Sequence, residues 1–444
     1  MTHPEKKTVG IVGGGIVGLT LALELSERGY GVTVLEAEDA VGGILVPMRI
    51  GDYTWDRFYH VILNSDRAVL GLLERLGLLG EIRWGATRTG FYTDGGFHSM
   101  SNILEFLRFP PLSFLDIFRL GGTIFLTSRI RSWQRLEKVS VESWLCRLSG
   151  RRTFQKIWLP LLKSKLGENY RVTNAAFIWA TIARMYAARR TGVKQEMFGY
   201  VGGTYGRVLD RLRATLEGRG VKLLCGQPVV RLGPADGGIE AKLADGTRLA
   251  FGAAALTTPC SGIPGICPAL SEPEKQRLGR LQYEHVVCLV LLLKKKLGGY
   301  YITNITEEGF PFTTVIEMTA LVDSGLFGGH SLVYLPRYLA DGDPVMGWDD
   351  AAVKDAFWKA LRQMHPQLAD GDVAAWAVTR ARSVFPVTTL NYSAEVMPET
   401  RTSVRGLFIA NSSQIPNGTM NVNELVALAG RKAQEIAGCM EGAG

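Results

Sequence analysis

The sequence predicts an α/β fold in which a domain with a parallel sheet is interleaved with a mixed α+β domain and a helical insertion. Three features predict it: a strand-turn-helix-strand unit at residues 8–36, a mainly helical block at residues 66–199, and strand patterns that return after residue 220. A chain of 444 residues has room for two or three domains. Its 46% hydrophobic and 21% charged residues are typical of a folded chain.

The first unit carries a glycine fingerprint. TVGIV predicts a strand, GGGIVG a turn, LTLALELSERG a helix and GVTVLE a second strand, so that Gly13, Gly15 and Gly18 form GxGxxG between strand and helix. Gly13 permits the tight turn, Gly15 lets the backbone approach a pyrophosphate, and Gly18 allows close helix packing. The phosphates would bind at the positive end of the helix, as in Rossmann-like domains.

Glu36 ends the second predicted strand, 18 residues after Gly18. A carboxylate there accepts hydrogen bonds from a ribose 2′-hydroxyl and repels a 2′-phosphate, which favours FAD or NAD over NADP. The alternative is that the glycines only make turns and that Glu36 is a solvated strand end.

The spacing E-x5-G-G, made by Glu36, Gly42 and Gly43, resembles the extended fingerprint of the flavin amine oxidase superfamily. Its members include monoamine oxidases, protoporphyrinogen oxidases, phytoene-type desaturases and, more distantly, UDP-galactopyranose mutases. The resemblance covers nearly the whole chain, and it implies FAD as the cofactor.

The resemblance extends to further cofactor-binding residues. Val229, in LLCGQPVVRL, matches the strand whose backbone holds the adenine in that family. Thr419, Met420 and Asn421 match a second flavin-contacting segment, where a helix N-terminus faces the ring and stabilises negative charge on it. Asn411 stands where many relatives have an acidic residue facing the ribityl chain, and Ile44 stands where many have arginine.

We expect a discontinuous FAD-binding domain and two further parts. Residues 1–65, 200–282 and 380–444 form the Rossmann-like FAD-binding domain, residues 66–199 a helical or mixed insertion, and residues 283–379 the sheet and helix of a substrate domain.

In this class the flavin carries the redox chemistry, while the protein holds a substrate C–H against flavin N5 and excludes water. The segment WDRFYHVI, at residues 55–62, follows the two glycines where relatives pass substrate-side residues under the flavin. His60 and Tyr59 are therefore the candidate catalytic residues, and the alternative is that both only pack. No Ser/His/Asp triad and no metal site are predicted.

Two further groups of residues are candidates for substrate contact. An aromatic pocket or an ordinary sheet core is predicted for Tyr300, Tyr301, Phe310, Phe312 and Tyr334. Either a grip on an anionic substrate or a solvated helix face is predicted for Arg184, Arg189 and Arg190.

Charge and hydropathy bear on partners and location. The net charge is +8, and residues 103–135 combine large apolar side chains with five arginines and two acids, which resembles a segment lying on an anionic membrane surface. A buried helix pair is the alternative. With no CxxC pair, no signal peptide and no spanning apolar run, we expect a cytoplasmic protein, either free or peripheral on the inner face of the membrane. No nucleic-acid-binding signature is present in the sequence.

The predicted function is an FAD-dependent oxidoreductase that dehydrogenates a C–C or C–N bond of a mid-sized, hydrophobic small molecule by hydride transfer to flavin N5. With no second dinucleotide fingerprint, the electron acceptor would be oxygen, a quinone or a carrier. The alternative is a non-redox flavoenzyme similar to UDP-galactopyranose mutase. Thr314 stands where the mutase pattern has an arginine, and a threonine supplies no charge for a diphosphate.

Overall fold

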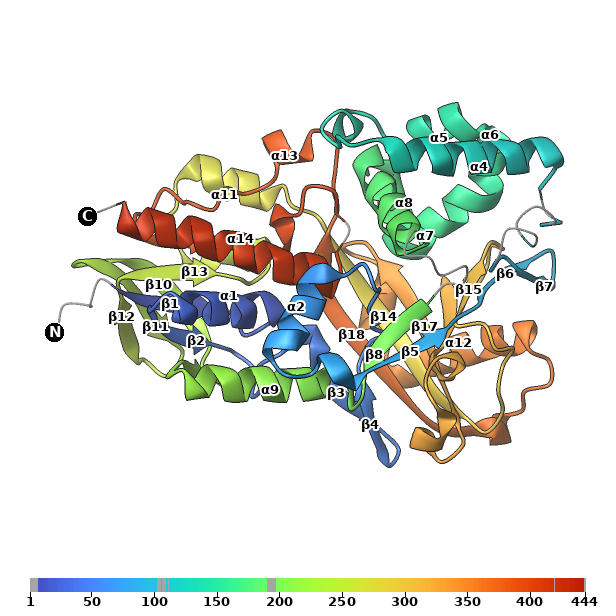
Figure 1. Cartoon of the computed structure of the whole chain (residues 1–444), viewed down its shortest axis with the longest axis horizontal. Helices are drawn as coiled ribbons and strands as arrows, with labels where there is room; N and C mark the ends of the chain where they lie inside the picture. Colours follow the sequence, from blue (N-terminus) through green and yellow to red (C-terminus); the bar gives the residue numbers. More distant parts are fainter. Residues whose placement is uncertain are drawn as a thin grey trace.

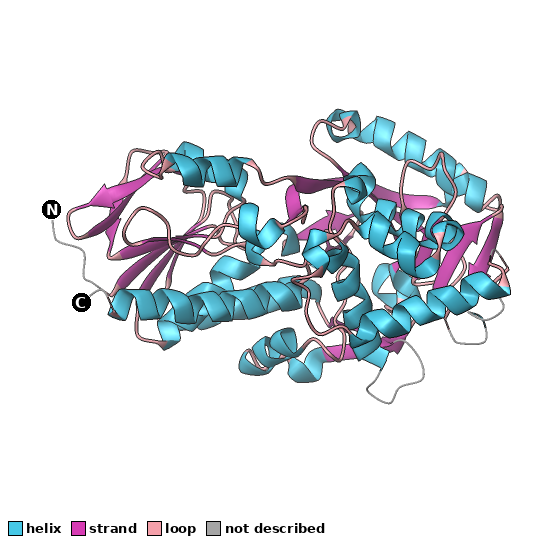
Figure 2. Ribbon diagram, turned by 90° about the horizontal axis from the view of Figure 1, so that it is seen from above, coloured by secondary structure: helices cyan, strands magenta, loops and turns pink. Residues whose placement is uncertain are grey.

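Two sheets lie toward opposite ends of an elongated molecule (Figure 1). The computed structural model describes residues 7–101, 105, 109–110, 112–189, 197–418 and 420–442. Both chain ends lie at the end that carries the smaller of these two sheets, as Figures 1 and 2 show.

The smaller sheet is parallel and has the strand order β19-β13-β1-β2-β9. Its strands come from three distant parts of the chain: β1 (Thr8–Val12), β2 (Gly31–Leu35), β9 (Lys222–Leu224), β13 (Ala253–Leu256) and β19 (Leu407–Ile409). Because each strand is short and apolar, the sheet is buried between layers, as parallel sheets are. The predicted Rossmann-like sheet is confirmed.

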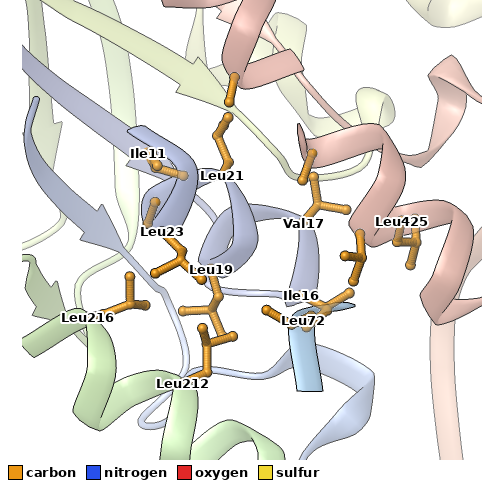
Figure 3. Close-up of a cluster of buried hydrophobic side chains, with 14 of the residues drawn as sticks. Ile11, Ile16, Val17, Leu19, Leu21, Leu23, Leu72, Leu212, Leu216 and Leu425 are labelled. Carbon is orange, nitrogen blue, oxygen red and sulfur yellow. The ribbon is translucent and has the colours of Figure 1, made fainter. Parts of the chain in front are cut away.

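Helix α1 (Ile16–Glu27) is buried on nearly all sides. It lies between three other helices, α2 (Arg67–Arg75), α9 (Thr204–Gly218) and α14 (Val422–Glu441). Figure 3 shows Leu19 pointing toward Leu212 of α9, and Val17 toward the segment that carries Leu425 of α14. Helices from the beginning, the middle and the end of the chain, α1, α9 and α14, therefore share one hydrophobic core.

An antiparallel three-stranded sheet connects β9 to β13. It consists of β10 (Val229–Ala235), β11 (Gly238–Leu243) and β12 (Arg248–Phe251). Its apolar side chains pack in a second core together with the short helices α10 (Ile263–Ile266), α11 (Glu272–Gly279) and α13 (Tyr392–Glu395).

The larger sheet has seven strands in the order β18-β14-β17-β16-β15-β6-β7. All pairs are antiparallel except β15 with β6. The strands are β6 (Thr89–Thr93), β7 (Gly96–Ser99), β14 (Tyr283–Leu293), β15 (Ile302–Ile305), β16 (Thr314–Glu317), β17 (Ser331–Leu339) and β18 (Val373–Pro386). The sheet thus includes β6 and β7 from residues 66–199, which were expected to form a separate insertion. Strand β18 extends past residue 380, the boundary that was expected between the substrate domain and the FAD-binding domain.

The two faces of this sheet have different partners. Val287, Leu289 and Leu291 of β14 pack against α12 (Asp350–Met364). The alternate residues Val286, Cys288 and Val290 pack against the segment that follows β4, in a cluster that also contains Ile44 and Tyr59. This second face, which we call the inner face, therefore meets the loops that leave the nucleotide-binding sheet.

A group of helices covers one end of the inner face, at the upper right of Figure 1. It contains α4 (Phe114–Arg129), α5 (Val141–Ser149), α6 (Arg151–Thr153), a π-helical turn (Phe154–Trp158), α7 (Leu159–Leu166) and α8 (Ala175–Arg189). The structure also has two antiparallel two-stranded sheets, β3 (Pro47–Ile50) with β4 (Tyr53–Asp56) and β5 (Ile82–Ala86) with β8 (Met197–Val201). The predicted class, α/β with a mixed α+β part and a helical insertion, is confirmed.

Candidate active site

The glycine fingerprint forms a tight turn between β1 and α1. Gly13 has φ of +107°, a conformation that favours glycine, and a Cβ on Gly18 would lie 2.0 Å from the Gly13 carbonyl oxygen. Thr257 closes the turn from the next strand, because its hydroxyl donates to the carbonyl oxygens of Val12 at 3.0 Å and Gly13 at 2.9 Å. The sequence reasoning missed Thr257, since its role depends on the β1–β13 pairing.

The second glycine pair lies beside the first motif. Gly42 donates its N–H to the Gly14 carbonyl oxygen at 2.8 Å, and Gly15 and Gly42 form a parallel bridge. Gly42 and Gly43 have φ of +131° and +58°, and a Cβ on Gly43 would lie 3.5 Å from the Gly15 Cα. The E-x5-G-G segment therefore closes over the fingerprint turn.

Glu36 lies against the fingerprint turn. Its Oε2 accepts from the Gly14 N–H at 2.6 Å, and its Oε1 accepts from the Glu38 N–H at 3.0 Å. Gln227, two residues before Val229, donates its N–H to the Glu36 carbonyl oxygen at 2.9 Å. Val229, the first residue of β10, is thereby held close to the end of β2.

The residues of this turn fit the pyrophosphate of FAD. No heavy atom beyond the chain neighbours lies within 4 Å of a Cβ placed on Gly15, so the backbone there is open to a ligand. Gly15 is also the N-cap of the 12-residue helix α1, and no side chain caps that end. The first N–H groups of α1 thus keep the orientation that anions bind.

The C-terminal loop differs in its contacts from residue to residue. Asn411 is buried, and its Nδ2 donates to the Thr258 carbonyl oxygen at 2.8 Å. Its Oδ1 accepts from the Ser413 N–H at 3.1 Å, so the side chain connects two loops. Thr419 lies outside the described residues. Met420 packs against both the nucleotide-binding core and the helical core, and Asn421 caps α14 by accepting from the Glu424 N–H at 3.1 Å.

His60 is packed against Tyr205, with ring centroids 5.4 Å apart and an edge-to-face geometry. Its Nδ1 is buried and has no hydrogen-bond partner among the described residues. Burial lowers the pKa of His60 to about 4, and a hydrogen bond with the Phe58 backbone opposes that shift. The ring is consequently neutral at pH 7.

Tyr59 lies in a polar group on the inner face. Its hydroxyl is 3.2 Å from the hydroxyl of Tyr338, and Lys165 Nζ donates to it at 3.2 Å. Lys165 Nζ also lies 5.3 Å from the Tyr59 ring centroid and 5.1 Å from that of Tyr338, within cation–π range. Burial, followed by the neighbouring Tyr338, raises the pKa of Tyr59 well above its usual value.

Glu284 is a second polar group on this face that the sequence reasoning missed. It is fully buried, its Oε1 accepts from Asn169 Nδ2 at 2.8 Å, and its Oε2 has no hydrogen-bond partner among the described residues. Burial raises the pKa of Glu284 to about 8, against the effect of the Asn169 hydrogen bond and helped by Asp341. The single acid at the head of EHVVCLVLLL is the signal that could have identified it.

Asp56, in the same WDRFYHVI segment, holds α9 in place. Its Oδ1 accepts from the Tyr205 N–H at 3.0 Å, and its carbonyl oxygen accepts from the Tyr334 hydroxyl at 2.6 Å. Burial raises the pKa of Asp56 to about 7, although the Tyr205 N–H and Thr204 hydrogen bonds oppose the shift. Asp56 therefore supports the strand end from which Tyr59 and His60 project.

Four of the five aromatic residues proposed for one pocket are divided between the two faces of the sheet. Tyr301 and Tyr334 belong to the inner face, whereas Phe310 and Phe312 pack on the α12 side. These four form sheet core, as the alternative predicted. Tyr300 is partly exposed, and its ring centroid lies 4.7 Å from Arg88 Cζ. Arg184 is ion-paired with the buried Asp66 at 2.8 Å, so its charge is already neutralised, and the side chains of Arg189 and Arg190 are outside the described residues.

Within the part of the chain that the structure describes, no group of His, Cys, Asp and Glu side chains is arranged to hold a metal ion. In the same part, no helix has both the length and the apolar content needed to cross a membrane.

A family model described as flavin containing amine oxidoreductase matches residues 16–436. The chain belongs to this family. The match begins directly after Gly15 and spans Gly18, the second glycine pair, the seven-stranded sheet and most of α14. The predictions of the superfamily, of FAD as the cofactor and of an FAD-dependent oxidoreductase are thereby confirmed.

Individual relatives are distant. Protoporphyrinogen oxidase 2 of Arabidopsis thaliana is 39% identical over 72 residues, which are 16% of this chain and 14% of that enzyme. The chain thus matches only about one seventh of the length of the plant enzyme. Zeta-carotene desaturase of Synechocystis sp. is 22% identical, over 85% of this chain and 86% of that enzyme.

The fold is shared with solved structures. A protein from Exiguobacterium sp. 255-15, described as a candidate protoporphyrinogen oxidase, superposes with a TM-score of 0.77 at 18% identity. The superposition covers 98% of this chain and 99% of that one.

Proposed function

We propose that the protein dehydrogenates a C–C or C–N bond of a mid-sized, hydrophobic small molecule. The observation that carries the proposal is the position of Tyr59, where the loop after the second glycine pair meets the inner face of the sheet, next to His60, whose ring packs against Tyr205. FAD, when bound, supplies the hydride acceptor. The protein's own task is then to hold the substrate and to exclude water.

The cofactor would be held by the residues named from the sequence. Gly13, Gly15 and Gly18 would cradle the pyrophosphate, Glu36 the ribose, and the backbone at Val229 the adenine. Gly42 and Gly43 would close over the phosphates. Met420 and Asn421, at the head of α14, would face the ring together with Thr419, and Asn411 would act by positioning the loops around it.

The substrate would lie over the inner face. Apolar side chains make up most of this face, which supports a hydrophobic substrate. His60, neutral and with Nδ1 unpartnered among the described residues, would accept a hydrogen bond or a proton from the substrate as the hydride leaves. Tyr59 would line the same space. Residues 1–65, 200–282 and 380–444 would form the cofactor part, with residues 66–199 and 283–379 enclosing the substrate.

Anaerobic mixing tests this proposal. The purified holoprotein is mixed with amines, porphyrinogens, polyenes and nucleotide sugars while the oxidised flavin band is followed. We expect bleaching with a member of the first three classes, and re-oxidation by oxygen, a quinone or a carrier. Failure of all of these to bleach the flavin contradicts the proposal.

The mutase-like alternative has less support. Thr314, at the position of the mutase arginine, is buried in β16 and carries no charge to offset a diphosphate. Conversion of UDP-galactopyranose by the reduced protein would favour this alternative.

We also propose that α4 rests on an anionic membrane surface. Large apolar side chains on this helix are exposed: Phe114 (81%), Leu115 (56%), Phe118 (73%), Phe125 (49%) and Leu126 (55%). The single acid of α4, Asp116, is buried. Arginines 119, 129, 131 and 135 are exposed at the helix and just beyond it, which suits anionic headgroups. Part of the predicted segment 103–135 lies outside the described residues.

Cosedimentation with phosphatidylserine vesicles tests the α4 surface. Arg129→Gln, Arg131→Gln and Arg135→Gln together should weaken binding, and so should added salt, because headgroup attraction is screened over about 10 Å at 0.1 M. The matched control changes Arg211, Arg213 and Arg219 of the α9 region to Gln, since α9 lies on the opposite side of the molecule (Figure 1). Equal loss in both triple variants, or no response to salt, contradicts the proposal.

A further inference from the structure

A small polar group interrupts the apolar inner face near the helical group. Tyr338 of β17 pairs across from Val286 of β14, so Glu284, two residues before Val286, projects from the same face. The chain from Lys165 to Asn169 crosses over this point, because a Cβ on Gly167 would lie 3.4 Å from the Tyr338 carbonyl oxygen. Lys165 thus contacts Tyr338, and Asn169 contacts Glu284.

Lys165, Tyr59 and Tyr338 differ from their neighbours in keeping accessible surface. Each is half-buried, whereas Tyr334 and Val286 on the same face are buried. The three side chains are therefore accessible to solvent, whereas these two neighbours are not.

The charge of Lys165 has no acidic partner in the part of the chain that the structure describes. No described carboxylate lies within ion-pair distance of its Nζ, which donates to the Tyr59 hydroxyl and lies beside two rings. Lys163, two residues earlier, shows the ordinary arrangement, with Glu168 at 3.5 Å. A half-buried cation beside two phenols is costly to desolvate, and an incoming anion would offset that cost.

The remaining groups of the cluster suit an anion as well. Two hydroxyls 3.2 Å apart hold two hydrogens and use one between them, so one phenolic O–H is left to donate. Glu284, whose pKa burial raises to about 8, is mostly protonated at pH 7 and does not neutralise Lys165. The cluster then presents one positive charge and several donors.

We infer that Lys165, with the hydroxyls of Tyr59 and Tyr338, is an anion subsite that binds a carboxylate of the hydrophobic substrate. The inference rests on the proposed function, because it places this subsite in the same space as the reacting bond. A monoanion is favoured over a phosphate, since the site offers one lysine and no arginine fork.

Binding of 1-naphthoate to the FAD-loaded protein, measured by calorimetry, tests the subsite. The neutral 1-naphthamide and the dianionic 1-naphthyl phosphate are the comparison probes. Wild type should bind naphthoate at least about tenfold more tightly than the amide, and Lys165→Met should remove that preference. Lys165→Arg should keep most of it. Lys163→Met, which removes the same charge from the same helix, should leave it intact.

Several results would overturn the subsite. They are absent naphthoate binding, equal affinity for naphthoate and its amide, stronger binding of the phosphate, or equal loss in the Lys165→Met and Lys163→Met proteins. FAD content and thermal melting of each variant report folding independently, and the Lys165→Arg protein tests the charge if Lys165→Met is unstable. If the protein binds naphthoate through Lys165 but no substrate reduces its flavin, the subsite is supported and the proposed function is contradicted. If charged and neutral substrates reduce the flavin equally well, only the subsite is contradicted.

Discussion

The nucleotide-binding part and the inner face of the larger sheet are built on different principles. In the former, glycines along one short stretch make contacts that no side chain would allow, such as the approach of Gly18 to the Gly13 carbonyl oxygen. On the inner face, Tyr59, Lys165, Glu284 and Tyr338 come from four distant segments and meet only in the folded chain. Cofactor binding is therefore a local property of this sequence, whereas substrate recognition depends on tertiary structure.

We expect the largest effect at two glycines of the fingerprint turn, one of which leaves room for a ligand and the other for the protein's own backbone. Gly15→Val should abolish FAD binding while the protein stays folded, because no protein atom lies near the added Cβ. Gly18→Val should instead lower the melting temperature, since its Cβ would clash with Gly13. Flavin absorbance and thermal melting measure both. A Gly15→Val protein that still binds FAD would show that the fingerprint turn does not hold the cofactor.

Glu36→Ala should weaken FAD binding by about 1.5–3 kcal/mol, through loss of a charged hydrogen bond to the ribose. Glu38→Ala removes the same charge from an exposed neighbour and should change the affinity little. Fluorescence titration of the apoproteins with FAD compares them. Equal affinities in the Glu36→Ala and wild-type proteins would show that Glu36 only braces the Gly14 backbone.

His60→Gln tests the segment that connects the nucleotide-binding part to the inner face of the larger sheet. If the ring acts on the substrate, the variant should retain FAD and stability but reduce its flavin at least about tenfold more slowly under anaerobic conditions, a barrier increase near 1.4 kcal/mol. If His60 only packs against Tyr205, stability should fall while the folded fraction reacts at the wild-type rate. Stopped-flow spectroscopy combined with thermal melting distinguishes the two outcomes.

The smallest effect concerns stability and pH on the inner face. The pKa of Glu284 is raised from 4.5 to about 8, so its contribution to stability is complete below pH 4.5 and is lost as the pH rises toward 8. The pKa of Asp56 is also raised, so its contribution to stability is likewise lost as the pH rises toward about 7. The pKa of His60 is lowered, so its contribution is lost as the pH falls from 6.5 to about 4. Glu284→Gln should flatten the decline by at most about 1.4 kcal/mol per pH unit.

Urea unfolding between pH 5 and 8 measures the Glu284 effect. The unfolding free energy of the variant should rise relative to wild type as the pH increases. Parallel profiles would mean that Glu284 titrates normally, and they would weaken the description of a neutral carboxyl on the inner face.

The sequence predicted the nucleotide-binding part well for a physical reason. A turn that requires glycine at fixed intervals, followed by an acid at a strand end, leaves a contiguous pattern at Gly13, Gly15, Gly18 and Glu36. Thr257 could not be recognised in the same way, because its hydrogen bonds to Val12 and Gly13 require β13 to pair with β1.

The substrate side was predicted only in part. Tyr59 and His60 were found because they follow the glycine pair, but Lys165 lies in LLKSKLG, which reads as an ordinary amphipathic helix. Tyr334 and Phe312 were grouped by residue type, yet strand alternation places them in different cores. Long-range pairing decides such contacts, and no local pattern records it.

The flavin spectrum and the mass of the product together distinguish dehydrogenation from isomerisation. Each candidate substrate is mixed anaerobically with the holoprotein in a single turnover. The account predicts one flavin reduced for each product formed, with a product lighter by two hydrogen atoms. A product of unchanged mass, formed without net loss of oxidised flavin, would contradict it and identify an isomerase.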